Sequence, residues 1–290
     1  MQLISYIFFR AVVFLFYLLP FNSIYVVSNG LAYLLAHVFK YRKDVVLTNL
    51  KYAFPEKSES ELEDIANKSY RNLSDIIVES LKGFSTDPQT IYKRYPIPYP
   101  DFMQTFYESK KDTVCFAAHY NNWEWATYCT PIGMPFTPIG LIKPVRNKYI
   151  NDYTNKKRCR TGTQVVSIFE QNKSFKSEAN NPKMMVYIGD QNATHTEKSI
   201  LIDFLGKPTY CLHGAEQIAR KNNWPIFFGR VERVKRGQYE IHIELVSENP
   251  RSTEFGQITE SCFNILEKQI RRKPENWLWT HKRWKRNNIY

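Results

Sequence analysis

The residues best suited to chemistry lie in the short segment Cys115–Trp125, where His119 and Glu124 stand five positions apart. On a continuous α-helix this spacing would place the two side chains about 140° apart, so they could not face each other. The local sequence indicates a break instead: an apolar strand ends just before His119, and two asparagines, typical turn or N-cap residues, precede a helix. Across such a turn the carboxylate can meet the imidazole, fix its tautomer and raise the basicity of its other nitrogen, which makes a general base.

The plain alternative for this pair is a structural histidine, with its ring nitrogens hydrogen-bonded within the protein, beside an exposed glutamate. A single His–Glu pair carries little weight by itself. The position favours a functional role, because open α/β sheets bind ligands at the carboxyl ends of their strands and His119 follows such a strand. The sequence therefore indicates a candidate base and leaves its use open.

The rest of the chain narrows the reactions that such a base can serve. No Gly-x-Ser-x-Gly elbow occurs, so no serine nucleophile is visible, and Cys115 lies mid-strand as a core residue would. Neither a Walker-type nor a Gly-x-Gly-x-x-Gly phosphate loop is present. Cys211, His213 and the isolated His195 do not make a metal site, so no metal is expected. A base without a protein nucleophile suits direct transfer, in which it deprotonates a substrate hydroxyl that attacks an activated acyl group.

The composition describes a folded, basic protein. The 290 residues include 40 Lys and Arg against 28 Asp and Glu, a formal net charge of +12, and 15% of them are aromatic. A disordered chain would be poor in aromatic and aliphatic residues, whereas 43% of this chain is hydrophobic. Five widely spaced cysteines without a Cys-x-x-Cys pair favour a reducing compartment over a disulfide framework. The excess of positive charge and aromatics fits either a nucleic-acid binder or an enzyme on an anionic membrane surface.

The apolar N-terminal segment separates these two classes. From residue 3 to 39 the one formally charged side chain is Arg10, and a membrane-spanning helix needs about 20 mostly apolar residues. We therefore expect residues 1–43 to form a membrane anchor helix, bent or re-entrant if not straight, and residues 44–290 to form the main domain. A cleaved signal peptide and a buried pair of core helices are the alternatives. The basic cluster at 40–43 places the main domain on the cytoplasmic side, and a membrane anchor makes nucleic acid a poor partner.

Short apolar runs alternate with helical patterns along the remaining chain, which indicates an α/β fold with a mixed sheet flanked by helices. A capping box at Ser58 and Glu61 opens an amphipathic helix that ends near Gly83. Arg236 and Gly237 make a good hairpin turn between the last two strands. We expect strands over 113–118, 136–142, 164–169, 184–189, 225–233 and 238–246, and helices near 124–128, 147–160, 214–223 and 253–272.

The motifs, taken in order, resemble a known family. His119 and Glu124, in the setting Ala-His-Tyr-Asn-Asn-Trp-Glu, are similar to the HX₄(D/E) motif of the lysophospholipid acyltransferase superfamily and, more narrowly, of the late acyltransferases of lipid A biosynthesis. Further similar segments cover nearly the whole chain: 49–56, 143–147, 158–160, 189–191, 203–206 and 274–285. The resemblance implies a glycerol-phosphate acyltransferase-like fold and no cofactor, with acyl carrier protein delivering the acyl chain. The acceptor would be a hydroxyl of a lipid A precursor at the inner membrane, and anionic membrane lipids would be further partners.

The resemblance also implies roles for individual residues. His119 would be the general base and Glu124 its orienting partner, with backbone N–H groups of Tyr120–Trp123 donating to the oxyanion. Asp190, at a strand end, would contact the acceptor or support a residue that does, although a turn residue is an equal alternative. Without the resemblance, Arg158 is one solvated charge in a basic run. The residues expected to bind substrate are Asn122, Lys143, Asn147, Arg158 and Asp190.

Departures from the family's pattern concern the acceptor. The segment Lys143–Asn147 differs from the usual Arg-Pro-x-Asn, and Gln191 and Asn192 stand where several members carry charged residues. Transfer to an aminolipid or glycolipid, and a noncatalytic membrane-associated binding protein, are therefore the rival hypotheses. The aromatic and basic cluster Trp277–Lys285 fits a membrane-interface belt or core packing better than stacking on nucleic acid.

Overall fold

A computed structural model describes residues 1–170, 175, 178–193 and 199–290 of the chain. Its centre is a six-stranded sheet in the order β3-β2-β4-β1-β7-β8. The first five strands in this order run parallel, and β8 pairs with β7 in the antiparallel sense. The predicted mixed α/β sheet is thus confirmed. The strands are β1 (Thr113–Ala117), β2 (Thr137–Ile142), β3 (Gln164–Ser167), β4 (Lys183–Ile188), β7 (Ile226–Lys235) and β8 (Gln238–Ser247).

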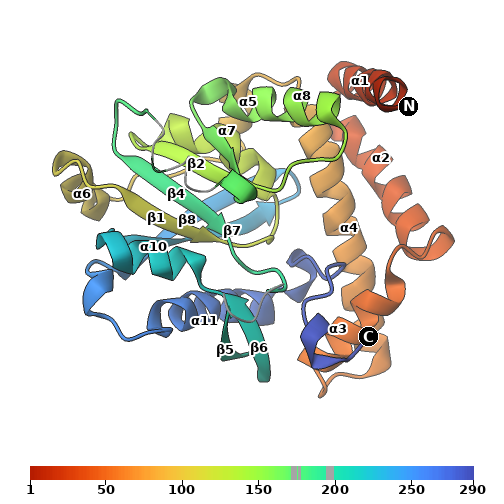
Figure 1. The fold of residues 1–290 in the computed structure, drawn as a ribbon. Helices are drawn as coiled ribbons and strands as arrows, with labels where there is room; N and C mark the ends of the chain where they lie inside the picture. The colour runs from red at the N-terminus through yellow and green to blue at the C-terminus, as the bar shows by residue number, and fades with distance from the viewer. Residues whose placement is uncertain (171–174, 176–177, 194–198) are drawn as a thin grey trace.

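Helices cover both faces of this sheet, with α5, α7 and α8 on one face and α10 and α11 on the other (Figure 1). Because the central strands are covered twice, their sequences read as continuous apolar runs and not as alternating ones. Phe116 of β1, for example, stacks on Phe228 of β7 and meets Phe263 of α11 edge to face. The helices are α5 (Pro88–Tyr92), α7 (Trp123–Gly133), α8 (Lys148–Arg158), α10 (Gly214–Asn222) and α11 (Gln257–Arg272), with α3 (Lys43–Ala53) and α6 (Gln104–Glu108) at the periphery.

The 25-residue helix α4 (Glu59–Gly83) stands beside the sheet and next to the N-terminal helices (Figure 1). Its predicted capping box is present. The side chain of Ser58 accepts a hydrogen bond from the N–H of Glu61 at 3.3 Å, and the Glu61 carboxylate accepts one from the N–H of Ser58 at 2.8 Å. The helix therefore starts and ends where the sequence pattern predicts.

The predicted membrane-spanning anchor is not supported. Pro20, which has no N–H, follows an extended residue and divides the apolar segment into α1 (Gln2–Leu18) and α2 (Phe21–Tyr33). A π-helical turn (Leu34–Val38) then completes the segment. No helix among the described residues is both long and apolar enough to cross a membrane. The division of the chain at residue 43 stays a prediction.

Both N-terminal helices pack on α4. Phe16 of α1 and Ile24 of α2 form a small core with Val78 of α4. The Nζ of Lys82 donates to two carbonyl oxygens at the end of α1, at 2.7 and 2.9 Å. These carbonyls have no partner within the helix, so the buried ammonium caps α1 at the corner where the chain turns into α2.

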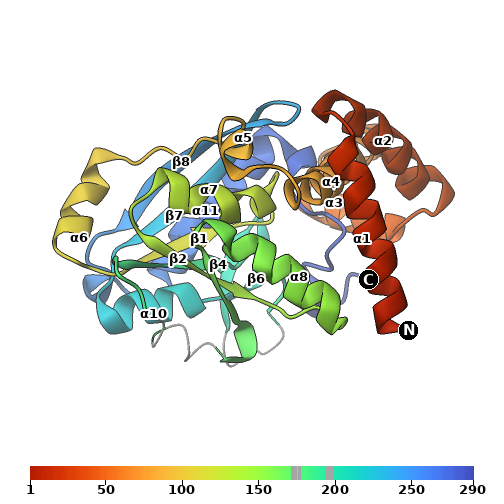
Figure 2. The ribbon, with the colours of Figure 1, turned by 90° about the horizontal axis from the view of Figure 1, so that it is seen from above.

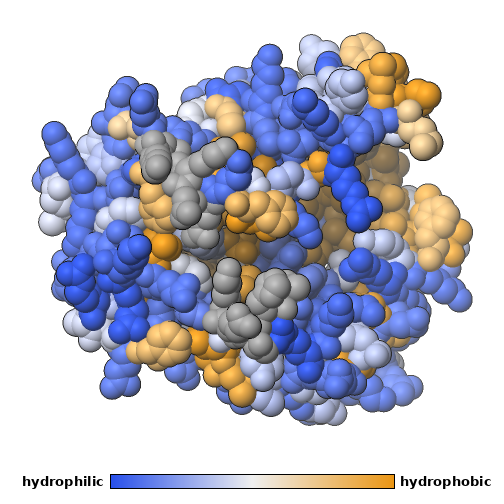
Figure 3. Space-filling model, viewed as in Figure 1, coloured by the Kyte–Doolittle hydropathy of each residue, from blue (hydrophilic) through white to orange (hydrophobic). Residues whose placement is uncertain are grey.

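The same two helices leave large apolar side chains exposed. Figure 3 shows apolar surface gathered at the right-hand edge of the view, over α1 and α2. Exposed apolar surface of this kind marks contact with another apolar surface. The most exposed of these side chains include Ile4, Ile7 and Phe8 of α1 and Val26 and Tyr33 of α2.

A two-stranded antiparallel sheet, β5 (Ser199–Phe204) with β6 (Lys207–Leu212), is absent from the predicted elements. Its turn residues Leu205 and Gly206 have φ values of 58° and 71°, the backbone of a tight hairpin turn that favours glycine. The sequence pattern that could have predicted this hairpin is two short runs of β-branched and aromatic residues on either side of Leu205-Gly206.

The tryptophans of the C-terminal cluster lie in the core. Trp277, Trp279 and Trp284 are 4%, 1% and 1% exposed. Phe204 of β5 packs on two of them, Trp277 and Trp284. Core packing is therefore the correct alternative for these three residues, and the membrane-interface belt is wrong for them because Phe204 of the β5–β6 hairpin packs on Trp277 and Trp284 and Phe54 packs on Trp279.

Glu79 of α4 is fully buried and accepts three hydrogen bonds. The donors are the hydroxyl of Tyr25 at 3.0 Å, the amide of Asn122 at 2.6 Å and the hydroxyl of Tyr239 at 2.7 Å. They belong to α2, to the residue before α7 and to β8. Burial raises the pKa of Glu79 to about 7, although the donors from Tyr239 and Asn122 oppose this.

We expect Glu79 to make the free energy of unfolding fall as the pH rises from about 4.5 to about 7. The unfolded chain loses this proton near the ordinary pKa of 4.5, whereas the folded protein keeps it up to about pH 7. The difference corresponds to about 3 kcal/mol. Glu79→Gln keeps an acceptor for Asn122 and should lose this part of the pH dependence, which urea unfolding at about pH 5 and about pH 8 measures. The same pH dependence in both proteins would contradict a titrating Glu79.

Candidate active site

His119 and Asp190 follow two adjacent parallel strands, β1 and β4. Both side chains therefore emerge at the carboxyl edge of the sheet, where α/β proteins bind ligands. The Nδ1 of His119 lies 2.7 Å from Oδ1 of Asp190, and the backbone N–H of His119 donates to Oδ2 at 3.0 Å. The carboxylate thus holds both the ring and the backbone of the histidine.

Asp190 is only 2% exposed, and its Oδ2 accepts a further hydrogen bond from the indole N–H of Trp277 at 2.8 Å. Burial alone would raise the pKa of Asp190, but His119 and the indole together hold it below its usual range. An ionised carboxylate needs donors, so Nδ1 of the neutral imidazole carries the ring proton. Nε2 is then left as an acceptor, which is the arrangement of a general base.

Nε2 of His119 faces the side chains of Gln191 and Trp123. The amide nitrogen of Gln191 is 3.3 Å away, and the ring of Trp123 packs edge to face on the imidazole with centroids 4.9 Å apart. The His119 side chain is 19% exposed. With its proton on Nδ1, the ring accepts a hydrogen bond from the Gln191 amide at Nε2, and a substrate hydroxyl that took the place of this amide would leave the Asp190 contact on the opposite nitrogen intact.

The predicted contact between His119 and Glu124 is wrong. Glu124 lies in the first turn of α7, and both of its carboxylate oxygens accept hydrogen bonds from Arg158 of α8, at 2.6 and 3.1 Å. Asn121, with a φ of 53°, turns the chain between His119 and α7, and the carboxylate meets α8 as a result. The imidazole nitrogen that Glu124 was expected to hold is held by Asp190.

An apolar cavity lies next to Trp123, the residue that packs on the His119 ring. Trp123 lines its start together with Ala117, and it continues between the sheet and α7 as far as Tyr95 and Met134. Its volume is about 120 Å³. Small side chains on the sheet and on α7 leave this space open: Cys115, Ala117, Ala126, Gly140 and Gly229.

The chain matches the sequence model of the bacterial lipid A biosynthesis acyltransferases over residues 2–286. It belongs to this family. The predicted family is confirmed, and the protein is an acyltransferase. A similar protein is the lipid A biosynthesis acyltransferase of Haemophilus influenzae, which is 22% identical over 270 residues that make up 90% of this chain and 81% of that protein.

Asn122 of this acyltransferase is fully buried and its side chain is hydrogen-bonded within the protein, and its role toward substrate stays a prediction. Its Oδ1 accepts from the N–H of Trp125 at 3.1 Å as the N-cap of α7, and its Nδ2 donates to Glu79. The predicted oxyanion donors are also partly occupied, because the N–H groups of Asn121 and Trp123 already bond to backbone carbonyls. In the structure Asn122 therefore stabilises the loop between His119 and α7.

The other residues that were expected to bind the acceptor lie on different parts of the acyltransferase. Asn147 caps α8 through the N–H of Ile150, and its amide donates to the backbone of Gln2 at 2.8 Å, where α1 lies alongside α8 (Figure 2). Lys143 is exposed after β2, whereas Arg158 is 17% exposed and paired with Glu124. Their role toward substrate stays a prediction.

Asp190 and Trp277 show which site residues the sequence pattern missed. Asp190 was predicted to contact or support the acceptor site, and its hydrogen bond to His119 was not predicted. One feature of the sequence could have indicated this pair: Asp190 follows the apolar run of β4, just as His119 follows that of β1. Trp277 was noted only as part of an aromatic cluster, and no spacing connects it with a residue 87 positions away.

The expected absence of a metal stays a prediction. Cys211 accepts a hydrogen bond from Arg283 at 2.9 Å, and His213 bonds to Gln217 at 2.7 Å. His195 lies outside the described residues.

We expect Asn122→Ala to lower the free energy of unfolding by about 1–2 kcal/mol, because it removes the N-cap of α7 and a donor to Glu79. Asn122→Asp keeps the capping oxygen but sets a second carboxyl against Glu79, so its stability should fall further as the pH rises above about 7. Urea unfolding of both variants measures these effects. If the Asn122→Ala variant has wild-type stability but binds substrate more weakly, Asn122 contacts substrate as predicted.

Proposed function

We propose that this acyltransferase moves a fatty acyl chain from acyl carrier protein to a hydroxyl of a lipid A precursor at the inner membrane, with His119 as general base. The observation that carries the proposal is His119, held at Nδ1 by Asp190 and packed on Trp123, which lines an apolar cavity. An acyl chain lying in this cavity would bring its thioester carbonyl next to the imidazole. The family of the chain, and the name of its Haemophilus relative, support lipid A as the acceptor. The reaction as proposed uses no further cofactor.

The proposed chemistry follows from the acceptor nitrogen of His119. Nε2 of His119 takes the proton of the acceptor hydroxyl while its oxygen attacks the thioester carbonyl, which forms the new C–O bond and a tetrahedral oxyanion. Collapse of this species breaks the C–S bond, and the imidazolium returns the proton to the departing thiolate. The Asp190 carboxylate stabilises the imidazolium between the two steps. The Gln191 amide, which lies 3.3 Å from Nε2, would give way to the acceptor hydroxyl and could then donate to the oxyanion.

Glu124 serves the acceptor through Arg158 in this proposal. Two hydrogen bonds from one guanidinium to one carboxylate fix the plane of Arg158 next to α7. Arg158 and the exposed Lys143 then offer positive charge to phosphate on the acceptor. Glu124 is thus a positioning residue for Arg158.

We place the enzyme on the membrane through the exposed apolar faces of α1 and α2. Helices with such faces lie in the lipid–water interface with their apolar side chains among the acyl chains. The basic residues 40–43, just after these helices, favour the anionic cytoplasmic leaflet. A lipid acceptor then reaches His119 from the bilayer while acyl carrier protein approaches from water.

We expect His119→Ala to lower kcat by about 10²–10⁴-fold, and Asp190→Asn to give a loss in the same range because it no longer fixes the tautomer. Purified protein, acyl carrier protein loaded with a fatty acid and a lipid A precursor make the assay, and mass spectrometry identifies the acylated product. Glu124→Gln is the matched carboxylate control and should raise KM for the acceptor more than it lowers kcat. Full activity in His119→Ala would remove the base assignment, and transfer only to an aminolipid would remove the lipid A acceptor.

Gly140→Leu tests whether the cavity holds the acyl chain. A Cβ at Gly140 would meet only the backbone of Gln164, at 3.9 Å, so the larger side chain can enter the cavity without a clash at its base. Loss of room for about two methylene groups should lower kcat/KM for long-chain donors about tenfold and spare shorter ones. Gly30→Leu adds the same side chain to α2, where nothing lies within 4 Å of the added Cβ, and should leave chain-length preference unchanged. Equal preferences in both variants would place the acyl chain elsewhere.

A further inference from the structure

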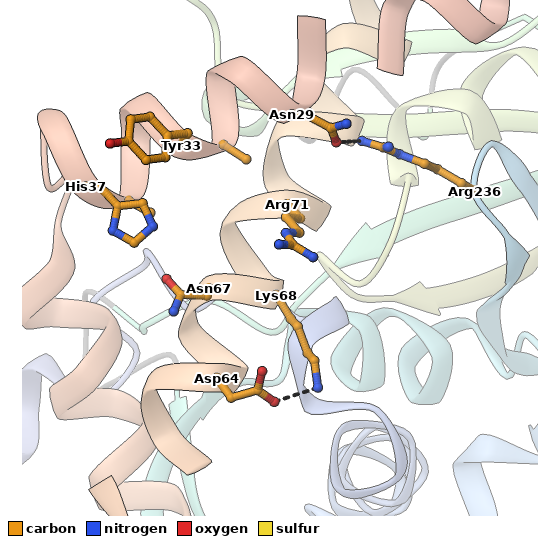
Figure 4. Close-up of a pocket in the computed structure, with 10 residues that line it drawn as sticks. Asn29, Tyr33, His37, Asp64, Asn67, Lys68, Arg71 and Arg236 are labelled. Carbon is orange, nitrogen blue, oxygen red and sulfur yellow. Dashed lines mark hydrogen bonds and ion pairs between the residues drawn. The ribbon is translucent and has the colours of Figure 1, made fainter. Parts of the chain in front are cut away.

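A polar groove runs between α2, α4 and the β7–β8 hairpin. Two adjoining cavities of about 730 and 410 Å³ form it, and they share the lining residues Asn29, Lys68, Arg71 and Arg236. In Figure 4, Arg71 of α4 and Arg236 of the hairpin reach into this space, and Tyr33 and His37 lie on the other side of it. The lining residues are different from the ones that surround His119.

The groove is basic, and part of its positive charge is free. Arg71, Lys235 and Lys273 form no side-chain ion pair or hydrogen bond with any residue that the structure describes, so their charges are available to an anionic ligand. The six basic residues of the groove are Lys68, Arg71, Arg233, Lys235, Arg236 and Lys273, and its three acidic ones are Asp64, Asp75 and Glu275.

Asp75 orders the arginines at the floor of the groove. It is 2% exposed and accepts hydrogen bonds from Arg233 at 2.5 Å, from Arg236 at 2.6 Å and from the hydroxyl of Ser28 at 2.6 Å. Arg236 also donates to Asn29 of α2 at 2.8 Å. Side chains held in this way lose less conformational entropy when a ligand binds.

The α2 wall of the groove continues into exposed apolar surface. Ala32 and Ala36 are small and leave the groove open, while Tyr33 lines it and is 62% exposed. Val26, two turns earlier on the same face of α2, is 71% exposed. A recessed cationic groove next to an exposed apolar helix face matches a ligand with an anionic head and apolar tails.

We propose that this groove binds the phosphate headgroup of an anionic phospholipid, with the lipid tails along α2. An acidic protein fits less well, because protein interfaces have a polar rim and this groove has an apolar one on its α2 side. The proposal rests on the membrane attachment proposed above and does not depend on the acyl-transfer chemistry.

Flotation of the full chain with vesicles tests the proposal. Phosphatidylcholine vesicles are compared with vesicles that also contain phosphatidylglycerol or, at equal surface charge, cholesteryl hemisuccinate, which has a carboxylate but no phosphate. Wild-type protein should bind the phosphatidylglycerol vesicles most tightly. The double variant Arg71→Ala/Lys235→Ala should lose about 30-fold in this binding. The control Lys51→Ala/Lys93→Ala removes the same charge from exposed positions outside the groove and should retain the preference.

Each other outcome has a definite meaning. Equal losses in the two double variants would overturn the groove in favour of general charge attraction. Equal binding of wild-type protein to all three vesicles would overturn the groove and leave membrane attachment intact, whereas binding to none would overturn both.

A higher KM of the double variant Arg71→Ala/Lys235→Ala for acyl carrier protein, with unchanged lipid preference, would assign the groove to the donor protein. A phosphate-induced rise in Tm without vesicles, lost in Arg71→Ala/Lys235→Ala, would assign it to free phosphate. Acyl-transfer assays of the wild-type chain report on the reaction separately.

Discussion

One buried charge, the carboxylate of Asp190, constrains the arrangement of the site and of the segments around it. An ionised carboxylate out of water is tolerated only when donors surround its oxygens. Asp190 obtains them from the imidazole and backbone of His119 and from the indole of Trp277. These contacts require β1 and β4 to be neighbours and the C-terminal segment to return across the carboxyl edge of the sheet. The same contacts put the ring proton on Nδ1 and leave Nε2 of His119 as the acceptor, so the donors that stabilise the buried charge also create the arrangement that the proposed base needs.

A second set of buried polar groups runs along α4. Asp75, Glu79 and Lys82 are spaced by four and three residues and therefore share one stripe of the helix. Each meets a different part of the chain: Asp75 the β7–β8 hairpin, Glu79 the N-cap of α7, and Lys82 the end of α1. An otherwise amphipathic helix thus connects the exposed apolar helices with the loop that carries His119.

Much of the fold, and part of the site, could be predicted from the sequence. The central strands are apolar runs because helices cover both sheet faces, and the position of His119 after such a run predicted its place at the carboxyl edge. The His119–Asp190 pair could not be predicted, because it depends on β4 lying next to β1, an order that two similar apolar runs do not encode. From the sequence, the nearby Glu124 was the natural partner for His119. In the structure the chain turns at Asn121, and Glu124 pairs with Arg158. For the N-terminal segment, overall apolarity indicated a span, but Pro20 and packing on α4 decided the structure.

The ammonium of Lys82 at the corner between α1 and α2 has a consequence for the proposed attachment to a bilayer. Because the corner is capped from within the protein, the angle between the two helices is set during folding and not by the lipid. Many amphipathic segments become helical only when they reach a membrane and lose conformational entropy at that moment. Here the two helices are ordered when the chain folds. In the proposed attachment they would therefore enter the lipid as one rigid body, and their orientation would also fix the direction in which the carboxyl edge of the sheet opens.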